Sequence, residues 1–294
     1  MMSLYSFFSA IELGLIYSLM VLGLFISYRI LNIPDLTVDG SFTLGAAVAV
    51  VATLAGHPVL GLLLAGLAGA AAGFVTALLQ TRMKIQPILA GIITMTALYS
   101  INLMVMDNKA NLPLAQGESI YHNLPGMLLS GLAAIGVAAV LVLFLQTPAG
   151  LAVRATGDNE AMVRSSSINA DRMKMAGLSI ANACVALSGA LIAHYNCYAE
   201  VRMGIGMVVI GLASLIVGEI AVGLLVRRAT ILSGAVAAIV GSVLYRLIIA
   251  QALEWNFSSS SLKLITAIIV ALAMSVPAVK ESLRLAKQRR AGMR

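Results

Sequence analysis

Long apolar runs alternate with short polar segments along the chain, and each run holds about as many residues as a helix needs to cross a bilayer, roughly 20. The first run has no basic leading segment and no small-residue cleavage site, so we expect it to be retained as a helix. The pattern predicts nine membrane spans. They lie at about 7–28, 36–55, 58–80, 85–106, 124–146, 175–195, 205–226, 229–251 and 262–279.

Composition supports this assignment. Of the 294 residues, 60% are hydrophobic and 11% are charged, whereas a soluble domain has about 25% charged residues. We therefore predict an all-α polytopic membrane protein with about nine helices, forming a single transmembrane domain over residues 1–294. Cys184 and Cys197 have neither a CxxC nor a Cys/His spacing, so we expect them to be small packing residues and predict no metal site.

The positions of lysine and arginine predict the orientation, because basic residues near span ends are retained in the cytoplasm. Nine spans put the termini on opposite sides, and the bias puts the N-terminus outside and the C-terminus inside, with a basic cytoplasmic tail at 280–294. The predicted cytoplasmic residues are Arg29, Arg82, Lys84, Arg154, Arg164, Arg172, Lys174, Arg227, Arg228, Lys280, Arg284, Lys287, Arg289, Arg290 and Arg294. Lys109, Arg202 and Lys263 fall outside and Arg246 falls within a span. This dispersal explains the net charge of +7 without a nucleic-acid partner.

Two stretches of the chain are similar in character: 34-PDLTVDGSFTLGAAVAVVATL-54 and 199-AEVRMGIGMVVIGLASLIVGE-219. Each has a small residue, an acid and a glycine-containing segment before an apolar run. In the predicted topology the two copies run in opposite directions, which is typical of inverted repeats with a pathway between the halves. Close packing of helices explains the small residues, but it does not explain an acid in both copies.

Ionisable residues at membrane depth are costly and usually face the bundle interior or water. They are interpreted either as lining a transport pathway or as hydrogen-bond partners where helices are broken. Arg246 is expected to reach toward the outer surface or to meet an acid. Asn102 and Asn182 are expected to hold helices together. The predicted pathway residues are Asp35, Asp39, Glu200, Gly206, Gly211 and Glu219.

The segment 150-GLAVRATGDNEAMVRSSSINADRMK-174 gathers charged residues between two apolar runs, and the predicted topology puts it in the cytoplasm. Asp158 or Asn159 can cap a helix N-terminus, and Glu160 in the first turn would meet the positive end of the helix. A short helix over 159–167 is therefore predicted.

This predicted helix has a small apolar face, formed by Ala161, Met162 and Ile168. Such a helix, held between two spans, is suited to docking into a groove on another protein. The alternative is a plain charged loop that only fixes topology, but such a loop would need neither the caps nor the length.

Sequence signatures of catalysis are missing. The chain has no G-x-x-x-x-G-K-[ST] loop, and the dipeptide Gly-Lys does not occur, so it cannot hydrolyse a nucleotide by that route. HExxH and GxSxG are also absent. The pattern therefore favours a conduit over an enzyme, and no catalytic residue is predicted.

Two stretches carry a family resemblance: 32-NIPDLTVDGSFTLGAA-47 and the longer 150-GLAVRATGDNEAMVRSSSINADRMKMAGLSIANACVALSGALIAHYNCYAEVRMGIGMVVIGLASLIVGE-219. In these the chain resembles permease subunits of bacterial ABC importers of the branched-chain amino acid and ribose type. It is most similar to the branch associated with tryptophan, tyrosine or related solutes. The resemblance covers most of the chain.

The resemblance implies a multi-pass protein of the bacterial plasma (inner) membrane. Two permease chains, here a homodimer, would form the pathway for a small solute such as an amino acid. Two ATP-binding cassette ATPase subunits would bind ATP and Mg on the cytoplasmic side, so this chain itself would hold no cofactor. An extracytoplasmic solute-binding protein would deliver the solute.

The resemblance also implies that segment 147–173 carries a coupling helix that contacts the ATPase. Many members have a glycine before the Ile-Asn pair, where this chain has Ser166 and Ser167, which bears on the local turn. The implied coupling residues are Gly157, Asp158, Asn159, Glu160, Ala161, Met162, Arg164 and Ile168.

Two other functions remain open from the residues themselves. A self-sufficient secondary transporter would use Glu219 or Asp39 to carry a coupling proton. A structural or channel-like membrane subunit would give passive flux or none.

Overall fold

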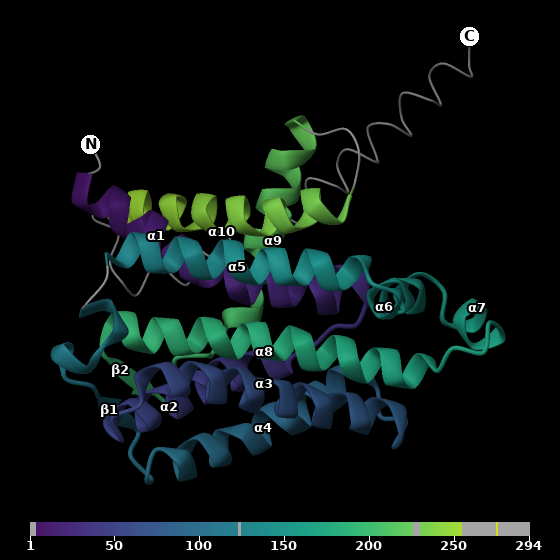
Figure 1. The fold of residues 1–294 in the computed structure, drawn as a ribbon, viewed down its shortest axis with the longest axis horizontal. Helices are drawn as coiled ribbons and strands as arrows, with labels where there is room; N and C mark the ends of the chain where they lie inside the picture. Colours follow the sequence, from purple (N-terminus) through teal and green to yellow (C-terminus); the bar gives the residue numbers. More distant parts are fainter. Residues whose placement is uncertain (1–3, 123–124, 226–229, 255–274, 276–294) are drawn as a thin grey trace.

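The structure is a computed structural model that describes residues 4–122, 125–225, 230–254 and 275 (Figure 1). Within these ranges, eight helices are long and apolar enough to cross a membrane. They correspond to the first eight predicted spans, while the ninth, 262–279, and the basic tail lie outside the described residues. The eight are α1 (Leu4–Leu24, continued by a π-helical turn η1, Phe25–Ile30), α2 (Thr37–Leu54), α3 (Pro58–Thr81), α4 (Pro87–Val105), α5 (Gly126–Gln146), α8 (Ala170–Asn196), α9 (Met207–Leu225) and α10 (Ile231–Glu254).

Side chains on the outside of the bundle are as apolar as those within it. Leu67 on α3 is 67% exposed and Leu132 on α5 is 63% exposed. A helix that is apolar all round is typical of a membrane span, because lipid solvates its outer face. The outward leucines therefore agree with the composition of the chain.

Helix α8 is central to the bundle. It packs on α2 and α3 on one side and on α1 on the other (Figure 1). Glycines allow the closest approaches: Gly45 on α2 lies against the backbone of Ala186, and Gly189 on α8 lies against the backbone of Phe42. Because lipid offers no hydrophobic driving force between helices, such close backbone contact is a main source of helix association in membranes.

The packing of the two halves is reciprocal. Helices α2 and α3 pack on each other, as do α9 and α10; α8 packs on α3, and α1 packs on α10. The first helix of each half thus lies against the third helix of the other half. This exchange is what an inverted repeat of three-helix units would produce, and it supports the repeat predicted from the sequence.

The two ends of the bundle differ. At one end a two-stranded antiparallel sheet joins β1 (Asn111–Pro113) to β2 (Tyr198–Glu200), next to the short 3-10 turns η2 (Gln116–Glu118) and η3 (Ile120–His122). At the other end lie α6 (Pro148–Asp158) and α7 (Glu160–Ser165). The sequence pattern predicts no secondary structure between the spans 85–106 and 124–146, so β1 is an addition to the predicted all-helical fold.

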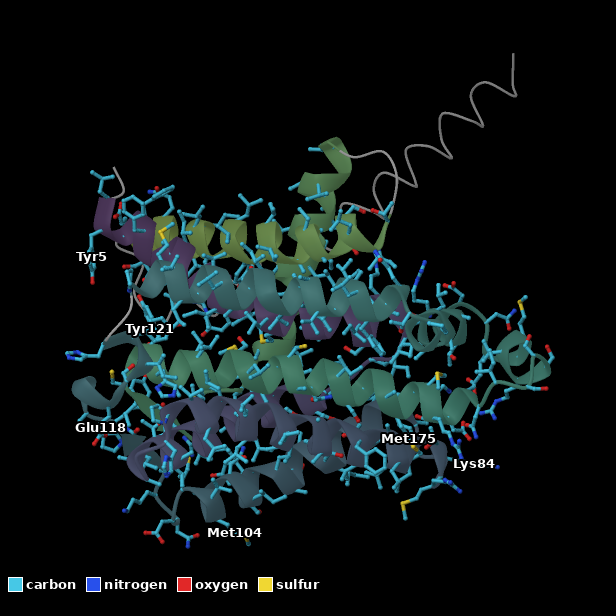
Figure 2. All side chains as sticks on the ribbon, in the orientation of Figure 1. Tyr5, Lys84, Met104, Glu118, Tyr121 and Met175 are labelled. Carbon is cyan, nitrogen blue, oxygen red and sulfur yellow. The ribbon has the colours of Figure 1, made fainter. Side chains whose placement is uncertain are left out.

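The described basic residues lie mainly at one of these two ends. Lys84 lies at the α6–α7 end, whereas Glu118 and Tyr121 lie at the β1–β2 end (Figure 2). The described basic residues predicted to be cytoplasmic all lie in or beside segments at the α6–α7 end, namely Arg29, Arg82, Lys84, Arg154, Arg164, Arg172 and Lys174. The predicted separation of basic residues is therefore present in the fold, and which end faces the cytoplasm stays a prediction.

Candidate functional site

The segment predicted to couple to a partner begins with a helix that the sequence did not predict. Helix α6 starts at Pro148, and the Thr147 hydroxyl accepts a hydrogen bond from the Gly150 amide at 3.2 Å. In Figure 1 α6 is seen nearly end-on, so it lies across the ends of α5 and α8. Val153 is fully buried, and Gly157 lies against the carbonyl of Ile30. Helix α6 is therefore a platform packed on the bundle, ahead of the short helix that the sequence predicted.

Helix α7 is shorter than predicted and begins where the sequence indicated. The Asn159 side chain caps it by accepting a hydrogen bond from the Met162 amide at 3.1 Å. Asp158 is exposed at the end of α6, so of the two residues that were candidates for the cap, Asn159 fills this role. The helix covers Glu160–Ser165, against the predicted 159–167.

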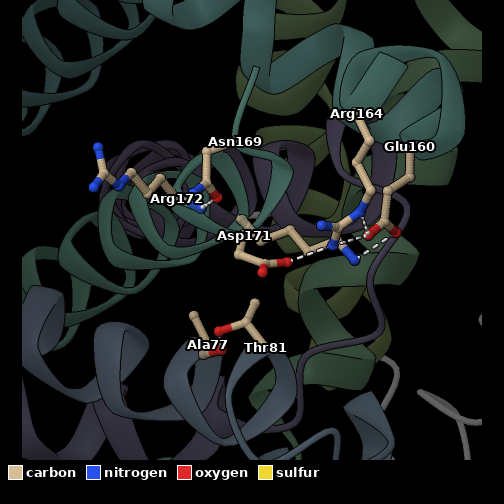
Figure 3. Close-up of polar contacts among 8 residues, drawn as sticks. Ala77, Thr81, Glu160, Arg164, Asn169, Asp171 and Arg172 are labelled. Atoms are coloured by element: carbon tan, nitrogen blue, oxygen red, sulfur yellow. Dashed lines mark hydrogen bonds and ion pairs between the residues drawn. The ribbon is translucent and has the colours of Figure 1, made fainter. Parts of the chain in front are cut away.

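An ion-pair network fixes α7 to the start of α8. Figure 3 shows Arg164 between two carboxylates: its Nη2 lies 2.8 Å from Glu160 Oε1 and 2.6 Å from Asp171 Oδ1. Lys174 Nζ lies 2.6 Å from Glu160 Oε2. Hydrogen bonds from Lys174 and then Arg164 hold the pKa of Glu160 below its usual range. Exposed pairs contribute only about 0–1 kcal/mol each, so the network acts mainly by fixing the position of α7.

Large apolar side chains are exposed on α7 and just after it. Met162 is 68% exposed and Ile168, just after the helix, is 38% exposed, while Val163 is buried. Ala161 is also exposed. The structure thus brings the predicted coupling residues from Asn159 to Ile168 together at one projecting turn, whereas Gly157 packs on the bundle.

The turn after α7 has the geometry that glycine favours. Ser167 has a φ of 61°, which lies in the left-handed region and costs a residue with a Cβ roughly 1–2 kcal/mol. Ser167 is one of the two serines that precede the Ile-Asn pair, where many members of the family that the chain resembles have a glycine. The chain keeps the left-handed turn with serine in place of glycine.

Two of the predicted pathway acids, Asp35 and Asp39, lie at interruptions of the helices. Asp35 is buried in the non-helical segment before α2; it accepts hydrogen bonds from the Thr37 amide at 2.9 Å and from Asn182 Nδ2 at 2.7 Å. Asn182 in turn accepts a hydrogen bond from Ser41 at 2.7 Å. Asn182 therefore joins α8 to the start of α2, as the sequence analysis expected for this residue.

The second interruption lies just before α9, and Asp39 on α2 supplies the hydrogen-bond acceptors there. Asp39 lies in the first turn of α2, and its carboxylate accepts hydrogen bonds from the amides of Gly206 at 2.8 Å and Val208 at 2.9 Å, at the start of α9. Thr43, one turn further along α2, accepts a hydrogen bond from the Gly204 amide at 3.1 Å. A carboxylate at a helix N-terminus satisfies free amides and opposes the helix dipole.

The other predicted pathway residues are dispersed. Glu200 is in β2, paired with Asn111, and Gly211 packs against Leu24. Glu219 on α9 forms a bidentate pair with Arg29, at 2.6 and 2.9 Å. That partner is 190 residues away in the sequence, so no local signal could have predicted the pair.

Arg246 fits only one of the two alternatives expected for it, because the described part of the structure shows no acid beside it. Among the residues that the structure describes, it meets no acid; its guanidinium carbon lies 3.7 Å from the centre of the Tyr17 ring. Tyr17 lies parallel to Phe42, with ring centres 6.0 Å apart. Sequence analysis did not connect these three residues, because they belong to α10, α1 and α2.

Comparison with known proteins places the chain in a family. The sequence model of the family described as "Branched-chain amino acid transport system / permease component" matches residues 6–273. The chain belongs to this permease family. The permease is 39% identical over 264 residues to the "Tyrosine transport system permease protein" of Clostridioides difficile (strain R20291), which covers 89% of this chain and 88% of that protein.

A second relative covers nearly the same length. An uncharacterised protein of Rickettsia prowazekii (strain Madrid E) is 30% identical over 274 residues, or 91% of the permease and 96% of the relative. No solved structure matches the permease. The predicted family, helical fold and transport function are confirmed, and the permease is a multi-pass inner-membrane protein.

The left-handed turn at Ser167 gives a test of the α7 geometry. We expect Ser167→Gly to be tolerated and Ser167→Val to open the turn, because a β-branched residue is strongly disfavoured at positive φ. Limited trypsin digestion in detergent would report this as faster cleavage after Arg164 in the valine variant than in the glycine variant. Equal cleavage of the two would show that the turn is not constrained.

The second interruption gives a test of Asp39. Asp39→Ala leaves two amides of the α9 start without their acceptor, which should cost about 1–3 kcal/mol and lower the melting temperature of the purified permease by several degrees. The control is Asp107→Ala, since that side chain is 88% exposed and its Lys109 partner is 3.6 Å away. A melting temperature unchanged in both variants would refute the capping role.

Proposed function

We propose that the permease is the membrane-spanning subunit of an ATP-driven importer, and that residues 157–168 form its docking helix for separate ATP-binding cassette ATPase subunits. The observation that carries the proposal is the projecting turn at α7. A short capped helix is fixed by three ion pairs and presents Met162 and Ile168 outward. A topology-fixing loop would need neither the fixed position nor the exposed apolar side chains.

The contacts behind α7 give a route for force. Asp171 and Lys174, which pair with α7, lie in the first turns of α8. Helix α8 packs along α2 and α3, and Gly157 ties the end of α6 to Ile30 at the end of η1. Movement of α7 by a closing ATPase pair would thus be transmitted to α8 and α1, one helix from each half of the reciprocal fold. In this proposal ATP and Mg are bound by the partner subunits.

The solute we propose is an aromatic amino acid, with tyrosine as the first to test. The support is the relative that is 39% identical over most of both chains and is named a tyrosine transport system permease protein. An extracytoplasmic binding protein would deliver the solute at the β1–β2 end, and two copies of the permease would form the pathway. Selectivity in the binding protein is compatible with the few charged side chains within the spans.

A charge on the exposed face of α7 should weaken ATPase docking. We expect Met162→Glu to lower the affinity for the ATPase subunits about tenfold, because a carboxylate is costly to bury in an apolar contact. The measurement is titration of the purified ATPase onto the permease in nanodiscs. Met104→Glu is the matched control, since Met104 is 71% exposed at the other end of the bundle (Figure 2). Unchanged affinity in Met162→Glu, or equal loss in both variants, would contradict the docking assignment.

Uptake measurements separate the importer from a secondary transporter. Proteoliposomes with the permease, its ATPase and its binding protein should accumulate labelled tyrosine only when ATP is supplied. Proteoliposomes with the permease alone should show no uptake on a proton gradient. Accumulation by the permease alone would instead assign it to proton-coupled transport.

A further inference from the structure

Arg246 is a charged residue inside a membrane-spanning helix without a counter-ion among the described residues. Its helix, α10, is 24 residues long and meets the criteria for a membrane span. A charge at this position is expensive unless it meets a partner or water. Its Nε atom is buried and has no hydrogen-bond partner in the described part of the chain.

The acidic side chains on other helices near Arg246 contact groups other than its guanidinium. The Asp39 carboxylate accepts hydrogen bonds from the backbone amides of Gly206 and Val208. Glu12, on the same helix as Tyr17, lies against Gly126. The position of Arg246 is therefore not explained by an ion pair with any residue that the structure describes.

The Tyr17 ring holds the guanidinium by one face. The guanidinium carbon lies 3.7 Å from the ring centre, and Tyr17 itself is buried and parallel to the fully buried Phe42. A cation held over an aromatic face gains about 0.5–2 kcal/mol, and the N–H groups of arginine point outward in the guanidinium plane. Stacking on the Tyr17 ring therefore orients the N–H donors of Arg246 without engaging them in hydrogen bonds.

The stack lies where the two helix interruptions meet. Tyr17 and Phe42 belong to the same apolar cluster as Val208, at the start of α9, and Met203 and Met207 pack against that cluster. Irregular backbone at membrane depth is tolerated where it is buried in protein or lines a water-filled cavity. Ile205 and Val209, which flank the α9 start, are 67% and 46% exposed, so this region reaches the surface of the chain.

We propose that Arg246, oriented by Tyr17, binds the carboxylate of the solute as it passes through the permease. Arginine suits this task because its planar fork matches the two oxygens of a carboxylate. The inference rests on the proposed import of an amino acid and adds a named contact to it. Arg246 is the binding residue, and Tyr17 and Phe42 are positioning residues.

The test compares solute imported with ATP hydrolysed in proteoliposomes that hold the permease, ATPase and binding protein, with labelled tyrosine as the probe. Arg246→Gln should lower the tyrosine-to-ATP ratio about tenfold while ATP hydrolysis stays within about twofold, because losing a charge-assisted hydrogen-bonded contact affects the solute and not the docking helix. The tyrosine-to-ATP ratio of Arg246→Lys should lie between those of Arg246→Gln and the unsubstituted complex. Tyr17→Phe should keep the ratio and Tyr17→Leu should lower it, since only the latter removes the ring.

A rescue experiment tests the charge and its access to water. Arg246→Cys in a Cys197→Ser background should be as defective as Arg246→Gln. A cationic aminoethyl methanethiosulfonate should restore part of the tyrosine-to-ATP ratio, whereas the neutral methyl reagent should not. Recovery with the cationic reagent alone would show that a positive charge is needed at a water-accessible position.

The outcomes separate this inference from the function on which it rests. If the unsubstituted complex shows no ATP-driven tyrosine uptake, the proposed function is overturned and the inference with it. If that complex imports tyrosine and the ratio in Arg246→Gln is unchanged, only the inference is overturned, as expected for a lipid or packing contact. Equal loss of uptake, ATP hydrolysis and assembly in Arg246→Gln would also overturn it, in favour of a structural role.

Discussion

Free backbone amides inside the membrane are the constraint on which this fold depends. Two helices, α2 and α9, begin next to non-helical segments within the bundle, where an unsatisfied amide costs several kcal/mol because lipid offers no acceptor. Asp35 and Asp39 supply acceptors at these two places. Because Asp39 is on α2 and its donors are at the start of α9, this one carboxylate also connects the two halves of the fold.

Close packing makes this connection possible. Glycines at the α2–α8 and α9–α10 contacts bring backbones together, so that Thr43 and Asp39 reach the segment before α9. Tyr17 and Phe42 share an apolar cluster with Met203 of that segment, and Arg246 lies over the Tyr17 ring. Helix interruption, small-residue packing and the arginine over Tyr17 are thus parts of one region, which an inverted repeat would place at the interface of its halves.

The α6–α7 end has a different physical character. Its short helices begin with local caps, a threonine for α6 and an asparagine for α7, and the ion pairs of α7 join residues at most 14 positions apart. These ion pairs involve only α7 and the start of α8. This separation suits a surface that must keep its shape while the helices behind it move.

The sequence by itself determined the membrane class, eight spans to within a few residues and two candidates for the cap of α7, because span length, apolar content and cap residues are local properties. It also predicted that Asp35 and Asp39 either line a pathway or form hydrogen bonds where helices are broken. It did not determine that Asp39 caps α9 or that Glu219 pairs with Arg29, since those partners are 167 to 190 residues apart. Only the tertiary structure decided those pairings, and with them the position of Arg246 over Tyr17, because they depend on which helices pack together and at what depth.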